Sequence, residues 1–278
     1  MGARAPNWII EDNIVRWNHG VGVVVGPSSQ MRRNHIHHNG QLGVAADGSF
    51  ALVEDNEIAY NNTVGYDAKW EAGGSKFAET QDLTVRDNYV HHNYGPGLWT
   101  DIDNIRTTYE GNLITDNDES GIYHEISYSA VIRNNRVYRN GKTFDPWMWG
   151  AQILIAGSQD VEVSGNTVVV GPGGGHGIGL IQQDRGTGRY GPYQVRNNYV
   201  HHNDVTYMDN DSGWSGAVAD DDEVGMLNGN NRFDYNSYHF TGDPIRWTWG
   251  DEKSWAAFQA LGQEAHGTID NQVVAPSE

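Results

Sequence analysis

The sequence of 278 residues contains no cysteine, few basic residues and no long apolar run. Without cysteine, disulfide bonds and thiol chemistry are excluded. Only 18 Lys and Arg residues stand against 36 Asp and Glu residues, which gives a formal net charge of −18. So acidic a surface repels phosphate groups, and neither nucleic acids nor anionic membranes are expected as partners. No stretch of about 18 apolar residues is found, so the sequence predicts no membrane-spanning helix.

Hydrophobic residues make up only 37% of the chain, whereas glycine occupies 35 positions. This composition suits a thin core and many tight turns. What the chain has in abundance is a repeated phrase, N-x-[I/V]-x-x-N. The phrase starts at Asn13, Asn34, Asn56, Asn88, Asn112, Asn135 and Asn198, with a Phe-containing copy at Asn231 and a weaker copy at Asn166. A fixed repeat of this kind predicts stacked structural units.

Successive copies start between 21 and 33 residues apart. A coil of about 21 to 24 residues can hold three short strands and three turns. The longer intervals predict the same coil with an inserted loop, at Ala72–Thr80, Gly141–Trp149, Asp184–Gly191 or Asp204–Ser215. Asn suits the corners because it tolerates the left-handed backbone of a sharp turn.

This pattern resembles the right-handed parallel β-helix of the pectate-lyase-like superfamily, in its Asn-rich form, over about residues 8 to 240. The resemblance implies an all-β solenoid, with a parallel β-helix of about nine coils over residues 1–242 and a C-terminal cap segment over 243–278. Asp251–Gln263 has an apolar face typical of a short amphipathic helix, which we expect to cover the last coil. We expect a preceding segment or a partner to cover the first coil.

The repeat glycines set a register for the stacked coils. They are Gly22, Gly43, Gly65, Gly97 and Gly121. Residues at equal offsets from them should stack about 4.8 Å apart, with offsets one and three facing inwards and offsets two and four facing outwards. This predicts one outward face on the middle coils that carries Asp67, Lys69, Glu71, Trp99, Asp101, Asp103, Tyr123 and Glu125. Neighbouring loops would wall it and contribute Lys76, Trp147 and Trp149.

The pair Asp101 and Glu125 is the strongest chemical signal on this face. Neighbouring coils would hold the two carboxyl groups about 5 Å apart, the separation found in retaining glycosidases. Lys69 next to Asp101 would favour its ionised form, and apolar Leu154 next to Glu125 would favour the protonated form. Asp101 is therefore the predicted nucleophile and Glu125 the predicted general acid/base. A sugar platform would come from Trp99 and Tyr123.

The segment G-L-W-T-D at Gly97–Asp101, followed by the Glu of Y-H-E-I, resembles β-helix glycoside hydrolases of the β-xylosidase type. In that family the Asp supplies the nucleophile and the Glu of the next coil the acid/base. The residues after Glu125 depart from the family's pattern, as does the length of the chain. The resemblance implies a secreted or extracellular bacterial enzyme, expected to be monomeric, that takes a polysaccharide or oligosaccharide without a cofactor.

Two other functions stay open. A polysaccharide lyase would bind Ca²⁺ through Asp67, Asp101, Asp103 or Glu125 and abstract a proton with Lys69 or Lys76. The acidic face disfavours a lyase, because polyuronates are anionic. A non-catalytic carbohydrate-binding or structural β-helix would bind sugar through the aromatic pair without turnover.

The sequence predicts no metal site. The His-His-Asn triplets at 37–39, 91–93 and 201–203 recur at one position of the repeat, which is typical of turn residues. Inward-facing His124 is interpreted as a core residue that orients Glu125.

Overall fold

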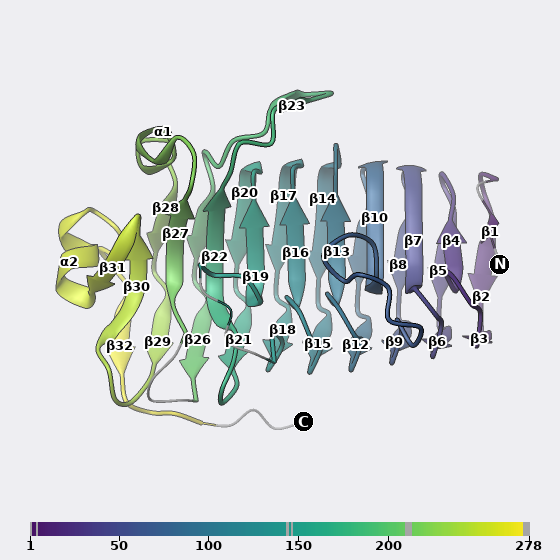
Figure 1. Cartoon of the computed structure of the whole chain (residues 1–278), viewed down its shortest axis with the longest axis horizontal. Helices are drawn as coiled ribbons and strands as arrows, with labels where there is room; N and C mark the ends of the chain where they lie inside the picture. Colours follow the sequence, from purple (N-terminus) through teal and green to yellow (C-terminus); the bar gives the residue numbers. More distant parts are fainter. Residues whose placement is uncertain (1, 4, 143–144, 146, 209–212, 275–278) are drawn as a thin grey trace.

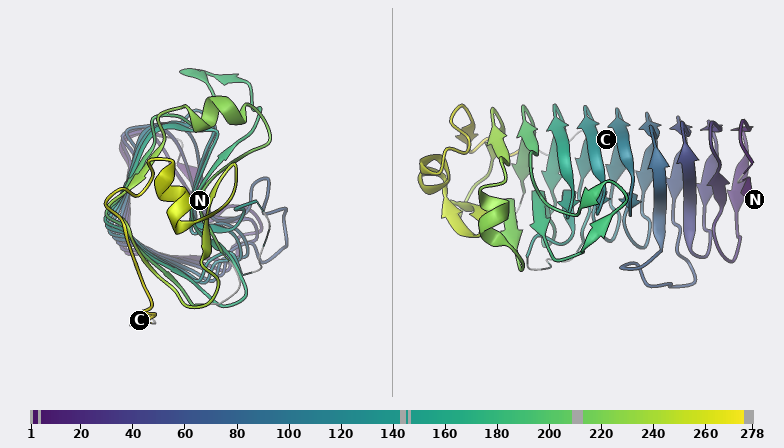
Figure 2. Two further views of the ribbon diagram at one scale, coloured as in Figure 1. Left: turned by 90° about the vertical axis from the view of Figure 1, so that its left-hand side faces the viewer. Right: turned by 90° about the horizontal axis from the view of Figure 1, so that it is seen from above.

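The computed structural model describes residues 2–3, 5–142, 145, 147–208 and 213–274. The chain forms a solenoid of stacked coils, with the strands of successive coils side by side along the long axis (Figure 1). Viewed down that axis, the coils superpose around a common interior (Figure 2). Almost all of the pairing between coils is parallel, and within the described residues helices are confined to α1 (Glu223–Leu227) and a second short segment near the C-terminus. The predicted all-β, parallel β-helix fold is therefore confirmed.

Each full coil contributes three strands, one to each of three faces. The first face contains β4 (Val23–Val25), β7 (Leu42–Ser49), β10 (Gly73–Gln81), β13 (Leu98–Asp101), β16 (Ile122–Glu125), β19 (Ala151–Ala156), β22 (His176–Gln182), β27 (Ser215–Ala219) and β30 (Ile245–Trp249), and β1 (Gly2–Ala3) pairs with β4. The second face contains β2 (Ile9–Glu11), β5 (Gln30–Arg32), β8 (Leu52–Glu54), β11 (Thr84–Arg86), β14 (Ile105–Glu110), β17 (Tyr128–Arg133), β20 (Gln159–Ser164), β25 (Tyr199–His201) and β28 (Arg232–Asp234).

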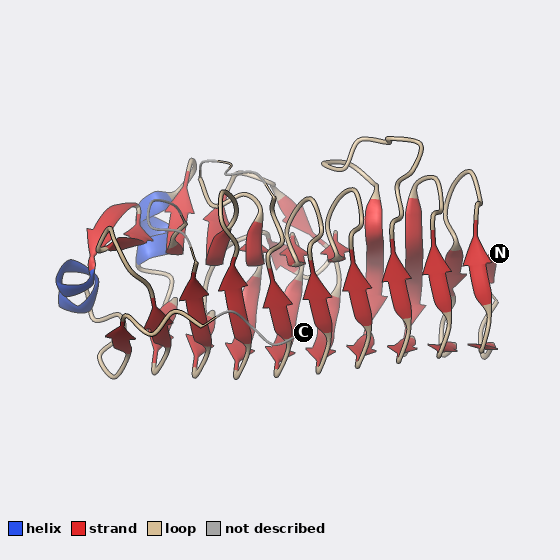
Figure 3. Ribbon diagram, turned by 90° about the horizontal axis from the view of Figure 1, so that it is seen from below, coloured by secondary structure: helices blue, strands red, loops and turns tan. Residues whose placement is uncertain are grey.

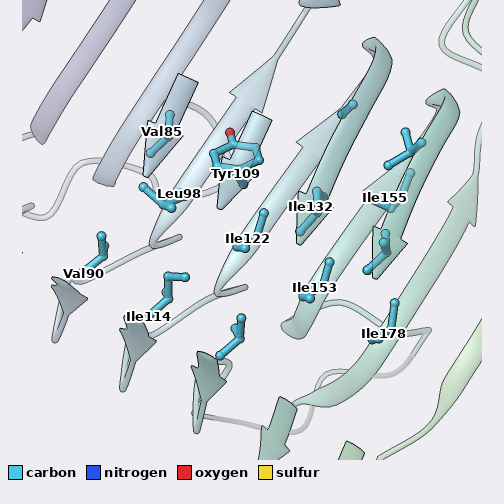
Figure 4. Close-up of a cluster of buried hydrophobic side chains, with 14 of the residues drawn as sticks. Val85, Val90, Leu98, Tyr109, Ile114, Ile122, Ile132, Ile153, Ile155 and Ile178 are labelled. Atoms are coloured by element: carbon cyan, nitrogen blue, oxygen red, sulfur yellow. The ribbon is translucent and has the colours of Figure 1, made fainter. Parts of the chain in front are cut away.

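The third face is a separate sheet of ten strands. It contains β3 (Ile14–Arg16), β6 (His35–His37), β9 (Glu57–Ala59), β12 (Tyr89–His91), β15 (Leu113–Thr115), β18 (Arg136–Tyr138), β21 (Thr167–Val170), β26 (Asp204–Tyr207), β29 (Ser237–His239) and β32 (Thr268–Asp270). Side chains from all three faces fill the interior in layers, as Figure 4 shows for the middle coils. Because every second residue of a strand points inwards, short strands with one or two apolar residues suffice for this core.

Ladders of buried Asn side chains hold the corners together. Asn93 shows the pattern: its Oδ1 accepts hydrogen bonds from the backbone N–H (3.1 Å) and the Nδ2 (2.9 Å) of Asn61, while its own Nδ2 donates to Asn117 Oδ1. One such ladder runs from Asn18 to Asn140 and ends on Gln152. Another runs from Asn13 to Asn236 and ends on Glu264.

The repeated phrase does not stay on one face. The copies from Asn13 to Asn166 precede strands of the third face, but the copies at Asn198 and Asn231 precede β25 and β28 on the second face. Asn203, the last residue of the Asn198 copy, continues the ladder of Asn166. The phrase therefore specifies a corner, a strand and the next corner, wherever in the coil that unit falls.

Two predicted loops are wrong in whole or in part. Of Asp204–Ser215, the first four residues form β26 and Ser215 begins β27, while residues 209–212 lie outside the described residues. Ala72–Thr80 was expected to be an insertion, but most of it is β10, and the insertion precedes it at residues 62–72. Gly74, not Gly65, takes the repeat position. A Cβ at Gly74 would lie 2.4 Å from the carbonyl oxygen of Gly97, whereas a Cβ at Gly65 would meet nothing within 4 Å. The crowded corner requires glycine, and Gly65 only reproduces the spacing on the exposed insertion.

Charged side chains of alternating sign form a column on the outside of the second face. On six consecutive strands the residues in line are Glu11, Arg32, Glu54, Arg86, Glu110 and Arg133. Arg32 Nε lies 2.7 Å from Glu11 Oε2, and Arg133 Nη2 lies 3.0 Å from Glu110 Oε2. Arg86 pairs with Glu54 in the same way. We call this set the charge column.

The C-terminal end of the solenoid is covered by a short helix, as predicted. Helix α2 (Trp255–Ala260) follows β31 (Asp251–Ser254), which is antiparallel to β30, and lies across the end of the stack (Figure 3). Phe258 is fully buried there against Phe233, Trp247 and Trp249. The parallel sheets continue beyond residue 242 through β30 and β32, so the segment 243–278 contributes strands as well as the cap. No helix in the described ranges is long and apolar enough to cross a membrane.

Candidate active site

The outward side of the first face carries three stacked side chains on β10, β13 and β16. Trp99 and Tyr123 are opposite each other in the register, and their rings lie 5.4 Å apart at 9°. Lys76 Nζ lies 4.1 Å from the centre of the Trp99 ring. The expected exposed sugar platform is wrong for Trp99, which is only 2% exposed and is covered by its neighbours. Tyr123, 9% exposed, still reaches the cavity described below.

Asp101 and Glu125 occupy opposing positions on β13 and β16, as predicted. The cation beside Asp101 is not the predicted Lys69 but Lys76, whose Nζ lies 2.8 Å from Asp101 Oδ2. The other carboxylate oxygen, Oδ1, is buried and has no hydrogen-bond partner among the described residues. One side of the Asp101 carboxylate is thus neutralised, while the other side retains an unused acceptor.

Glu125 is the most enclosed carboxyl group of this face, with a side chain only 8% exposed. Its Oε1 lies 2.5 Å from Arg185 Nη1, and its Oε2 accepts a hydrogen bond of 3.1 Å from Trp99 Nε1. Burial and then the neighbouring charge of Asp101 raise the pKa of Glu125, and Arg185 opposes that rise. Burial, reinforced by Glu125, also raises the pKa of Tyr123 well above its usual value.

The apolar neighbour predicted for Glu125 is shifted by two residues. Leu154 lies opposite Tyr123, and Ala156 lies opposite Glu125. The shift arises because Gln152, not Gly150, occupies the corner position, where its Oε1 accepts from the backbone N–H of Asn140 at 2.8 Å. The flank of Glu125 on the β19 side is nevertheless apolar, as the prediction required.

A cavity of about 480 Å³ opens beside Glu125. Its lining combines strand residues with residues of three insertions: Ala68, Lys69, Pro96, Glu119, Ser120, Tyr123, Glu125, Asp145, Trp149, Gly150, Leu154 and Arg185. Burial raises the pKa of Glu119, and the charge of Lys69, which also lines the cavity, opposes that rise. The volume falls within the range of small-molecule sites, and the mixture of aromatic, apolar and charged walls is typical of them.

The remaining predicted residues divide between the cavity and its surroundings. Lys69 and Trp149 line the cavity. Trp147 packs against an apolar cluster outside the solenoid, formed by Trp99, Tyr123, Met148, Ala151, Leu154, Ala156, Ile181 and Val218. Asp67 and Glu71 are exposed on the insertion of residues 62–72, so their predicted place in the strand column is wrong. That error follows from the choice of Gly65 as the repeat glycine.

Asp103 has a structural role in place of the predicted sugar contact. It lies in a left-handed corner with φ of 58°, and its Oδ1 accepts hydrogen bonds from Arg189 N and Tyr193 Oη, both at 2.8 Å. These two donors belong to residues 183–194, which we call the arm. The arm contains the short antiparallel strands β23 (Thr187–Gly188) and β24 (Gly191–Pro192).

The arm extends beyond the edge of the first face and runs back towards the N-terminal half (Figure 1). Tyr190 Oη accepts a hydrogen bond of 2.8 Å from Gln81 Nε2, and Arg189 Nη2 lies 3.0 Å from Glu79 Oε2. Tyr128 Oη donates to the Gly191 carbonyl at 2.6 Å. Residues of β10 and β17 thereby hold the arm in place, and Arg185 at its base reaches Glu125.

The sequence did not identify Arg185, Glu119 or Asp145 as site residues. The interval that predicted an insertion at Asp184–Gly191 did locate the arm, but spacing alone does not show where an insertion docks. Glu119 and Asp145 lie in connections between the third and first faces, where no repeat position applies.

The histidines are structural elements of the stack. His124 points inwards, is fully buried, and its Nδ1 lies 2.7 Å from Thr100 Oγ1. Burial lowers the pKa of His124 to about 3. Its hydrogen bond goes to the core side of the strand, away from Glu125, so the orienting role predicted for it is not supported.

The His-His-Asn triplets occupy corners: His38, His92 and His202 have φ values of 55°, 52° and 54°. Each stacks on an aromatic ring of a neighbouring coil, Tyr60 for the first two and Tyr235 for the third. Within the described part of the chain, no group of three or more His, Asp or Glu side chains is placed to hold a metal ion.

Residues 2–168 match the family described as the right handed beta helix region. Since the match extends over more than half of the chain, the protein belongs to this family. A search of curated proteins found no match.

Solved structures of β-helix proteins resemble the whole chain. XylC in complex with xylose has a TM-score of 0.64 at 14% identity, over 99% of this chain and 49% of its own. The A-module of mannuronan C-5 epimerase AlgE6 from Azotobacter vinelandii has a TM-score of 0.62 at 17% identity, over 98% of this chain and 65% of its own. The Dettilon tailspike protein gp208 has a TM-score of 0.50 at 15% identity, over 90% of this chain and 42% of its own. The chain thus spans less than two thirds of each, and the likeness at this identity is one of fold.

Proposed function

We propose that this protein is a retaining glycoside hydrolase that acts on an oligosaccharide or polysaccharide. The observation that carries the proposal is the direct opposition of Asp101 and Glu125 on neighbouring strands, with Glu125 in the wall of a cavity. Neighbouring parallel strands lie about 4.8 Å apart, and retaining enzymes hold their two carboxyl groups about 5 to 5.5 Å apart.

The two carboxyl groups have the environments that the two roles require. Asp101 is paired with the Lys76 ammonium group, and its buried Oδ1 accepts no hydrogen bond from the described residues, which suits a nucleophile. Glu125 is buried beside an apolar strand, and its raised pKa suits an acid that must hold a proton near neutral pH. Asp101 would attack the anomeric carbon while Glu125 gives its proton to the departing oxygen. Water would then break the glycosyl–Asp101 bond and return a proton to Glu125.

The comparisons agree with a sugar as the ligand. XylC was captured with xylose, and the AlgE6 module is named for an activity on mannuronan. Both are similar in fold to the chain, which spans only part of each. A cavity walled by two insertions and by Arg185 favours a short substrate or the end of a polymer over an extended chain.

The test is the release of reducing sugar from a panel of oligosaccharides and polysaccharides by the wild type and by Asp101→Asn and Glu125→Gln. Each substitution keeps the shape of the side chain and should lower turnover by about 10²- to 10⁴-fold. Asp67→Asn, an exposed carboxylate outside the cavity, is the matched control and should leave turnover unchanged. Wild-type activity that persists in both site variants would refute the proposal.

A polysaccharide lyase is the second candidate, favoured by the position of two cations, Lys69 and Arg185, in the cavity wall. They could meet a uronate carboxylate. A lyase leaves an unsaturated product that absorbs ultraviolet light, and a hydrolase does not. An absorbance assay on uronate polymers, with and without a chelator, therefore separates the two reactions. An absorbance increase that depends on Lys69 or Arg185 would favour the lyase.

A further inference from the structure

Arg185 reaches Glu125 from a part of the chain that follows it by 60 residues. The contact skips a whole coil, since Glu125 belongs to β16 and Arg185 follows β22, with β19 between them. The arm that carries Arg185 is held by Asp103, Gln81, Glu79 and Tyr128, none of which depends on Glu125. The guanidinium group is therefore brought to Glu125 by a separately anchored element.

The charges around Glu125 come from every element that packs on it. Strand β13 contributes the Asp101 carboxylate and the Trp99 indole N–H, and β16 contributes the Tyr123 hydroxyl. Strand β19 contributes only apolar groups. Across the cavity lie Glu119, Asp145 and Lys69. Lys76 is committed to Asp101, so Arg185 is the cation in direct contact with Glu125 among the described residues.

We propose that Arg185 is a positioning residue that stabilises the Glu125 carboxylate between the two halves of the reaction. The inference rests on the proposed function. In the first half, the Glu125 proton passes to the departing oxygen and leaves a carboxylate. In the second half, that carboxylate must accept a proton from the attacking water as the bond to Asp101 breaks. A carboxylate enclosed by apolar groups beside Asp101 would otherwise hold its proton too tightly to act as the base.

The contact can be measured without any substrate, because Trp99 Nε1–H donates to Glu125 Oε2. Its indole resonance in a ¹H–¹⁵N correlation spectrum should shift as Glu125 loses its proton. The resonance is assigned as the one whose titration disappears in Glu125→Gln. In Arg185→Gln, the midpoint of this indole titration should rise by about 1 to 3 pH units, because an opposite charge at this distance lowers the pKa of a carboxyl group by about that amount. Arg185→Lys should produce a smaller rise.

Arg189→Gln is the matched control. It removes a guanidinium group from the same arm, but one that contacts Glu79 and not Glu125. The midpoint of the Trp99 indole titration in this variant should equal that of the wild type. If Arg185→Gln does not fold, Arg185→Lys still decides the matter. An unchanged midpoint in a folded Arg185 variant would overturn the inference.

Kinetics give the second readout. The basic limb of the pH profile of kcat/KM reports the loss of the acid's proton. In Arg185→Gln the pKa of this limb should rise by the same number of pH units as the midpoint of the indole titration.

The glycosyl–enzyme should accumulate in Arg185→Gln and be visible in the intact mass, because its hydrolysis slows. Higher turnover with no glycosyl–enzyme would identify Arg185 as a blocking group and overturn the inference. No sugar release by the wild type would instead refute the proposed function, while the indole titration would still show whether Arg185 controls the ionisation of Glu125.

Discussion

A single carboxylic acid closes the longest Asn ladder. Glu264 is fully buried and accepts hydrogen bonds from Asn236 Nδ2 (2.6 Å), Asn236 N (3.2 Å) and Tyr238 Oη (2.8 Å). Burial raises its pKa from 4.5 to about 7. The other ladder ends on Gln152, whose amide makes a comparable bond to Asn140 without a charge. The last coil therefore contains a buried carboxyl group whose pKa lies near neutral pH.

We expect Glu264→Gln to change the pH dependence of stability. A pKa that is higher in the folded state means that the folded chain binds the extra proton, so stability is greatest below about pH 4.5 and falls as the pH rises to about 7. The amide side chain of the variant would keep the hydrogen bonds to Asn236 without a charge. The free energy of unfolding at pH 8 should rise by about 1 to 3 kcal/mol, and much less at pH 4.5.

Urea denaturation at the two pH values measures this difference. Glu223→Gln, at the exposed start of α1, is the control for the loss of one carboxylate outside the ladder. Equal effects of Glu264→Gln at both pH values would show that the carboxyl group does not ionise in the folded chain.

The two lysines near the site allow a direct comparison. Lys76→Met should lower kcat/KM by at least tenfold and reduce stability by about 1 to 3 kcal/mol, because Asp101 would be left without its hydrogen-bonded cation. Lys69→Met should have little effect on stability, since Lys69 is exposed on the insertion. The measurements are steady-state kinetics and thermal unfolding of both variants. A larger loss of kcat/KM and stability in Lys69→Met than in Lys76→Met would show that Lys69, and not Lys76, is the cation that supports Asp101.

At the scale of strands and turns, the sequence predicted well what the repeat controls. Asp101 and Glu125 each follow a repeat glycine by four residues, so their opposition could be derived from spacing. Lys69 was misplaced because Gly65 follows Asn61 at the repeat spacing but lies on an exposed insertion, whereas Gly74, thirteen residues after Asn61, occupies the corner. Arg185 could not be placed, because the contacts that dock the arm are side-chain contacts between distant coils and leave no periodic signal.

We expect the interior of an Asn ladder to be far less tolerant than its end. Asn93→Ala would remove the acceptor of two Asn61 donors and the donor to the Ile58 carbonyl, all of them buried. Each buried polar group that is left without a hydrogen-bond partner costs about 1 to 3 kcal/mol, so the loss of stability should be about 3 kcal/mol or more. Asn13→Ala, at the exposed end of a ladder, should cost less than about 1 kcal/mol. Comparable urea midpoints for the two variants would show that the ladders do not stabilise the stack.

For the molecule as a whole, stability should be distributed along the stack, because each coil contacts only its neighbours apart from the contacts that the arm makes with more distant coils. Phe258→Ala would open the C-terminal cap, where the ring meets Trp247 and Trp249, and should cost about 3 to 5 kcal/mol locally. Hydrogen exchange should then accelerate in β27 to β32 while the strands from β4 to β16 keep their protection. Uniform acceleration along the chain would indicate that the stack unfolds as one cooperative unit.

The charge column also bears on how the chain reaches this stack. Because successive coils are alike, the simplest folding error is to loop out one coil and join its two neighbours. On the second face that error would place Glu54 against Glu110, or Arg32 against Arg86, at the spacing of adjacent strands. Like charges directly opposite are destabilising, whereas the correct order pairs opposite signs at every step. Alternating charge would thus penalise, during folding, the omission of any one of the four coils between Glu11 and Arg133.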